Sequence, residues 1–81
     1  MKFTTAYSLN ELRIFEEIDA KLRDLGENTY NDVAYATEGL LYALTREETE
    51  EFQDAVDELC DFYKLNADDV ITWFMMLEIS Y

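Results

Sequence analysis

The 81-residue chain contains no proline and only two glycines, Gly26 and Gly39. Tight turns, the corners of β-sandwiches and glycine-rich phosphate loops depend on these residue types, so the sequence favours α-helices. Hydrophobic residues make up 49% of the chain and aromatic residues 15%, which is too apolar for a disordered chain despite a net charge of −13. At this length we expect one small all-α domain that spans residues 1–81.

Capping signals divide the chain into four predicted helices, which we expect to form a compact four-helix domain. In each signal a Ser, Thr or Asn is followed three residues later by Glu or Asp, and apolar residues then recur at intervals of three and four. The predicted helices cover about residues 9–25, 29–43, 46–64 and 66 to the C-terminus, after the signals Ser8 with Glu11, Thr29 with Asp32, Thr45 with Glu48, and Asn66 with Asp69.

Two local features leave alternatives open. Residues 2–7 are rich in β-forming side chains, so the alternative fold is α+β with a short N-terminal strand. Gly39 lies within the second predicted helix, where glycine costs about 1 kcal/mol relative to alanine, and it marks either a close helix crossing or an early end to the helix. That helix has few charged residues, and we expect it to be the most buried of the four.

The residue types that carry most catalysis are missing. The chain has no histidine, which excludes hydrolytic triads, the usual zinc-ligand spacings and the Glu-x-x-His pairs of di-iron bundles. The single cysteine, Cys60, is flanked by acids, which raise the pKa of a thiol and make it less reactive, so we expect Cys60 to be a small buried hydrophobe. A single cysteine cannot form a disulfide within the chain, so we expect a cytoplasmic protein. The acids lack the spacing of a calcium loop, and the longest strongly apolar stretch, 70–77, is too short to cross a membrane. The sequence therefore predicts no enzyme activity, no metal and no cofactor.

Acids are concentrated in the second half of the chain, where residues 41–81 hold 11 of the 19 acids but only two bases, Arg46 and Lys64. At 100° per residue, the acids of the third predicted helix fall opposite its apolar residues. This acidic row consists of Glu47, Glu50, Glu51, Asp54, Glu58 and Asp61. It extends over about 21 Å, with a carboxylate about every 5 to 6 Å, and it lacks the interleaved bases that stabilise a solvated helix. The spacing is similar to that of the phosphates along a nucleic-acid strand.

Three interpretations fit the acidic row: a solvated face that keeps the chain dispersed, a halophilic adaptation, and a binding face for a basic protein. A row of carboxylates can occupy a basic cleft that normally holds DNA or RNA, although it cannot bind nucleic acid itself. We choose this third interpretation. The predicted function is a small acidic inhibitor that mimics nucleic-acid charge and blocks a nucleic-acid-binding protein, in the cytoplasm of the host cell if a phage encodes it. The chain is similar to anti-restriction and anti-CRISPR inhibitors in composition and size alone, and it shares no sequence motif with them.

Two apolar features lie outside the predicted core pattern. Phe62 projects beside the acidic row, so it is either an exposed anchor of the binding face or a residue that the last helix covers. The last helix is apolar almost all round from Val70 to Ile79, which is more than a domain of this size readily buries. We expect one side of it to form a homodimer interface, through Trp73, Met75, Met76 and Ile79. The alternative function is a helical adaptor or oligomerisation module that binds a partner through this apolar helix.

Overall fold

The computed structural model describes residues 9–80, and for residues 79 and 80 the backbone only. This part of the chain is all-α, with four helices and no strand: α2 (Leu9–Leu25), α3 (Glu27–Leu41), α4 (Arg46–Tyr63) and α5 (Ala67–Ser80). The predicted all-α architecture is confirmed, and the first and third predicted helices match α2 and α4 to within one residue. The alternative strand over residues 2–7 and the capping signal at Ser8 lie outside the described residues.

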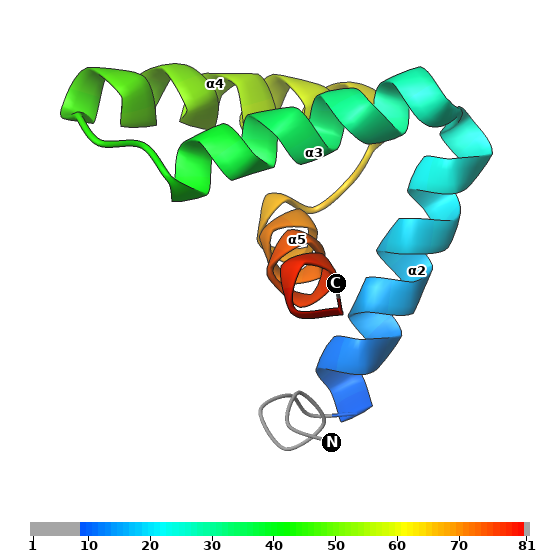
Figure 1. Cartoon of the computed structure of the whole chain (residues 1–81). Coiled ribbons are helices and arrows are strands. Elements are labelled where there is room, and N and C mark those ends of the chain that lie inside the picture. Colours follow the sequence, from blue (N-terminus) through cyan, green and yellow to red (C-terminus); the bar gives the residue numbers. More distant parts are fainter. Residues whose placement is uncertain (1–8, 81) are drawn as a thin grey trace.

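The helices pack as two pairs. Consecutive helices α3 and α4 lie side by side and antiparallel, whereas α2 packs mainly against α5, the helix farthest from it in sequence (Figure 1). Helix α5, seen end-on, lies in the angle between α2 and the α3–α4 pair (Figure 1), and it contacts all three other helices. This central position gives an apolar helix neighbours on several sides.

All four helices contribute to one hydrophobic core. Its buried members are Ile18, Leu22, Val33, Ala36, Val56, Cys60, Val70, Trp73 and Phe74. Helix α5 has the largest buried side chain, Trp73, and it also buries Met76. The expectation that the second helix is the most buried was wrong, because α5 occupies the centre and exposes less of its surface than α3, on which Tyr35 and Leu41 are exposed.

A single residue, Gly26, joins α2 to α3. Its φ of 115° and ψ of 160° belong to a backbone region that is essentially restricted to glycine. The predicted helix start at about residue 29, signalled by Thr29, was wrong: α3 begins at Glu27 without a side-chain cap. Gly26 turns the chain from α2 into α3 by its backbone alone, and its carbonyl accepts a hydrogen bond from the Tyr30 N–H at 2.9 Å (Figure 1). The Thr29 hydroxyl instead shares a hydrogen bond of 3.3 Å with the Tyr63 hydroxyl of α4.

The two helices of the α3–α4 pair approach closely at Gly39. A Cβ atom at this position would lie 2.3 Å from Cε1 of Phe52, so only glycine leaves room for the ring as it is placed. Of the two sequence-based alternatives for Gly39, the close helix crossing is therefore confirmed. Helix α3 ends at Leu41, two residues before the predicted end.

Both ends of α4 are fixed by specific hydrogen bonds. At its start, the Thr45 hydroxyl accepts a hydrogen bond from the Glu48 N–H at 3.1 Å, and the Glu48 carboxylate accepts one from the Leu44 N–H at 3.0 Å. At its end, Lys64 adopts a left-handed conformation with a φ of 59°, which allows the Leu65 N–H to donate to the Cys60 carbonyl at 2.7 Å. The caps hold α4 as a regular helix on which the acidic row lies.

Candidate protein-binding surface

The acidic row lies on the outer face of α4. All six of its side chains, Glu47, Glu50, Glu51, Asp54, Glu58 and Asp61, are exposed to solvent. On the opposite face of the same helix, Val56 and Cys60 are buried in the core. The separation of the buried and exposed faces is therefore as the sequence predicts, and all six carboxylates are open to solvent.

The eight acids of α4 divide into two groups by their contacts. Two acids outside the row make side-chain hydrogen bonds within the chain: Glu48 accepts from the Leu44 N–H, and Asp57 accepts from the Gln53 side-chain amide at 3.0 Å. The six acids of the row make no side-chain hydrogen bond and no ion pair with residues 9–80. The acids of α4 that form hydrogen bonds within the domain are therefore different residues from the acids of the row.

The bases of the described residues do not neutralise the row. Within residues 9–80 the ion pairs join Arg13 to Glu17 at 3.0 Å and Arg23 to Asp19 at 2.8 Å, both inside α2. Lys21 reaches the C-terminal end of α4, where its ammonium group donates to the backbone carbonyl of Lys64 at 3.2 Å. Since the neighbouring acids of the row repel one another without a compensating base, the row presents a continuous negative surface.

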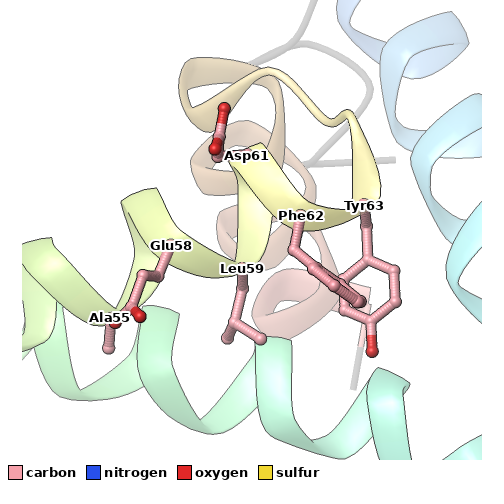
Figure 2. Close-up of a pocket in the computed structure, with 6 residues that line it drawn as sticks. All are labelled: Ala55, Glu58, Leu59, Asp61, Phe62 and Tyr63. Atoms are coloured by element: carbon pink, nitrogen blue, oxygen red, sulfur yellow. The ribbon is translucent and has the colours of Figure 1, made fainter.

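Phe62 is an exposed residue beside the acidic row. Its side chain is 75% exposed, so of the two alternatives the one in which the last helix covers Phe62 is wrong. The ring meets that of Tyr63 edge to face, with 4.8 Å between the ring centroids. The two rings and the Leu59 and Ala55 side chains line a shallow groove along the flank of α4. Glu58 and Asp61 also border this groove. Figure 2 shows that the Glu58 side chain extends to the same side as Phe62, whereas the Asp61 side chain extends the opposite way.

The residues of the expected dimer interface lie mostly in the interior. Trp73 is fully buried and Met76 is only 4% exposed, so neither side chain is at the surface of the chain. Met75 is 43% exposed, and the side chain of Ile79 lies outside the described part of the structure. The physical reason is the central position of α5, which buries more sides of this helix than the sequence pattern alone suggested. Dimerisation itself stays a prediction, with Met75 as its one surface residue among the described members of the set.

A second exposed apolar patch surrounds the loop from α3 to α4, and the sequence analysis did not single it out. Leu44 is 92% exposed, and the Tyr35 and Tyr42 rings are also largely exposed. The Tyr42 hydroxyl donates a hydrogen bond to the Glu78 carboxylate of α5, and this bond raises the pKa of Tyr42. The spacing of the two tyrosines, seven residues apart on one helical face outside the apolar stripe, was the signal in the sequence.

Neither Cys60 nor the carboxylates of the described residues form a catalytic or metal-binding arrangement. The Cys60 thiol is 4% exposed, and desolvation together with the charge of Asp57 raises its pKa, as expected for a buried hydrophobe. Among residues 9–80 no three His, Cys, Asp or Glu side chains are placed to hold a metal ion. No helix in this part of the chain is long and apolar enough to cross a membrane.

Comparisons with protein-family models, with curated proteins and with solved structures each found no match.

Proposed function

We propose that the acidic row of α4 binds the nucleic-acid-binding cleft of a basic protein and thereby inhibits it, in the manner of the anti-restriction and anti-CRISPR inhibitors of phages and mobile elements. The observation that carries the proposal is the division of the acids of α4: the six of the row are all exposed and make no side-chain hydrogen bond or ion pair with residues 9–80. A nucleic-acid-binding cleft offers Lys and Arg side chains at the spacing of phosphates, which a row of carboxylates can pair with in place of DNA or RNA.

Two effects that favour the binding of nucleic acid to a basic cleft also favour the binding of such a row. Exposed charges steer the encounter over distances of about one Debye length, roughly 8 Å at physiological ionic strength, and pairing releases counterions from the basic cleft. A solvated face that serves only solubility is expected to mix bases among its acids, because pairs of opposite charge three or four residues apart stabilise a helix. No base lies between Glu47 and Asp61 in the sequence, and the flanking Arg46 and Lys64 form no ion pair with the row. This arrangement supports a face that is kept negative for a partner.

The experiment is capture from a nuclease-treated bacterial lysate on the immobilised protein, followed by elution with duplex DNA or with RNA. We expect nucleic-acid-binding proteins among those captured, and we expect both nucleic acids and moderate salt to displace them, because each occupies or screens the same basic groups. The test variant carries E51K, D54K and E58K, which reverse the centre of the acidic row while leaving the core untouched. This variant is expected to fold and to capture none of these proteins.

A matched control separates the row from the overall charge. The variant with E16K, D24K and D32K changes the net charge by the same amount through exposed residues of α2 and α3. We expect this control to retain capture. Equal capture by wild type and the row variant, equal loss in both triple variants, or partners that nucleic acid does not displace would each contradict the proposal.

A further inference from the structure

We infer that Phe62 and Glu58 form a receptor for an arginine side chain of the basic partner, in which the guanidinium stacks on the Phe62 ring and pairs with the Glu58 carboxylate. This inference rests on the proposed function, because it specifies the chemistry of a protein that binds the acidic row. Phe62 is a large aromatic ring left 75% exposed at the edge of a negative surface. An exposed aromatic ring between carboxylates is a poor contact for an apolar partner and a good one for a cation.

Glu58 and Phe62 border the same groove: in Figure 2 the Glu58 carboxylate lies beside Ala55 and the Phe62 ring beside Tyr63. Glu58 and Phe62 are four residues apart in α4, a separation that brings side chains onto one face of a helix. Both line the groove along the flank of α4, and Figure 2 shows their side chains on the same side of the helix. The Phe62 and Tyr63 rings are perpendicular to one another, and the Phe62 side chain remains 75% exposed, so much of it is open to a partner.

The same chain already contains this arrangement with its guanidinium in place. The Arg23 guanidinium lies 5.0 Å from the centroid of the Tyr30 ring, while its Nε donates a hydrogen bond of 2.8 Å to the Asp19 carboxylate. At Phe62 the ring and the carboxylate are present, and no Lys or Arg of residues 9–80 forms an ion pair with Glu58. The missing member of the set is a guanidinium, which we assign to the partner.

Arginine fits this groove better than lysine. The planar guanidinium stacks on an aromatic face and still offers N–H groups in its plane to a carboxylate, whereas the compact ammonium group of lysine is more strongly hydrated. Nucleic-acid-binding clefts contain both residue types. The groove therefore gives the electrostatic row a chemical preference that charge alone does not provide.

The test measures affinity for two designed peptides of equal length and charge, one rich in arginine and one rich in lysine, at several salt concentrations. Wild type is expected to bind the arginine peptide about two- to fivefold more tightly, which corresponds to an exposed cation–π contact. F62L is expected to abolish this preference while retaining salt-dependent binding of both peptides, and F62W is expected to preserve or increase it. In an NMR titration with the arginine peptide, the resonances of Phe62 and Glu58 should shift.

Matched controls identify the groove as the source of the preference. Y35L removes an exposed ring of α3 that does not line the groove, and it should leave the preference unchanged. E58Q and E50Q each remove one charge from the row, and only E58Q should reduce the preference for arginine. The inference is overturned if wild type does not discriminate, if F62L still discriminates, or if E50Q and E58Q behave alike. Those outcomes leave the proposed function standing, because its own test is the loss of capture by E51K, D54K and E58K.

Discussion

The indole Nε1–H of Trp73 donates a hydrogen bond of 3.0 Å to Oδ1 of Asp19, across 54 residues of sequence. The same carboxylate oxygen accepts a second hydrogen bond, of 3.1 Å, from the Tyr30 hydroxyl. The other oxygen, Oδ2, accepts from the Arg23 Nε–H at 2.8 Å. The Tyr30 and Trp73 rings meet edge to face, with a centroid distance of 5.4 Å. One carboxylate of α2 therefore connects to both α3 and α5 at the edge of the core.

Replacing Asp19 by alanine is expected to destabilise the fold. The substitution leaves the fully buried indole N–H of Trp73 without its acceptor, and an unsatisfied buried polar group costs about 1–3 kcal/mol. Asn is expected to cost less, because its side-chain oxygen still accepts a hydrogen bond although it carries no charge. Urea denaturation followed by Trp73 fluorescence measures both. D24A, which removes an exposed carboxylate of the same helix, is the control, and an equal loss in D24A and D19A would contradict the assignment.

The contribution of Asp19 is also expected to depend on pH. Partial burial raises the pKa of Asp19, but the hydrogen bonds from Arg23, Trp73 and Tyr30 together with the Arg23 charge outweigh it and hold the pKa below its ordinary value of 3.8. Because the folded pKa is lower than the unfolded one, the stabilisation is present above pH 3.8 and is lost as pH falls through the folded pKa. The difference in unfolding free energy between wild type and D19N should therefore shrink in acid. A difference that stays constant from neutral pH into that range would contradict this.

The close crossing at Gly39 predicts a change of sign between two backgrounds. In wild type, G39A forces the added methyl group against the Phe52 ring, and overpacking of this kind typically costs about 1–3 kcal/mol. In an F52A background the ring is gone, and the same substitution should stabilise α3 by up to about 1 kcal/mol through helix propensity. A double-mutant cycle in urea measures the coupling. Equal effects of G39A in both backgrounds would show that the ring does not limit the crossing.

The acidic row is expected to lower the stability of the free protein. Its acids repel one another at separations of three and four residues, each pair at a cost of about 0.2–0.5 kcal/mol. Added NaCl should therefore raise Tm by screening the repulsion. The variant with E51K, D54K and E58K should be more stable than wild type and less sensitive to salt than the variant with E16K, D24K and D32K. The same salt slope in both variants would show that the repulsion is spread over the whole surface.

Cys60 is expected to react slowly in the folded protein. The thiol is 4% exposed, and its pKa is raised by desolvation and by Asp57, so little reactive thiolate is present near neutral pH. An aromatic disulfide reagent at pH 8 should modify the thiol far more slowly in native protein than in urea, where glutathione serves as the reference thiol. Equal rates in the native and unfolded states would place Cys60 at the surface.

Local signals predicted the parts of the fold that depend on neighbours in sequence. Thr45 caps α4, and the Asn66 side chain accepts a hydrogen bond from the Asp69 N–H at 3.1 Å at the start of α5, both as their spacing indicates. The two faces of α4 follow from helical periodicity, so the exposed acidic row was predictable as well. The start of α3 was not predictable, because Gly26 turns the chain into α3 without any side-chain cap.

Contacts between residues that are far apart in sequence could not be predicted from the local sequence pattern. The role of Asp19 depends on Trp73 and Tyr30, which reach it from other helices, and a single carboxylate among the acids of α2 carries no local mark of that role. The burial of Met76 depends likewise on the placement of α5 between its neighbours. The residue pattern of an apolar helix is the same whether the helix is covered by a second copy of the chain or by the other helices of its own chain.

The separation of the acids of α4 has a consequence for how this sequence can change over generations. Glu48 and Asp57 hydrogen-bond to Leu44 and Gln53, whereas the acids of the row bond to nothing within residues 9–80. Substitutions in the row are therefore expected to alter the proposed recognition without a penalty to folding, and substitutions in the core are expected to do the reverse. Natural variants that meet different partners should differ along the outer face of α4 and agree on its inner face, so that one helix carries two independent rates of divergence.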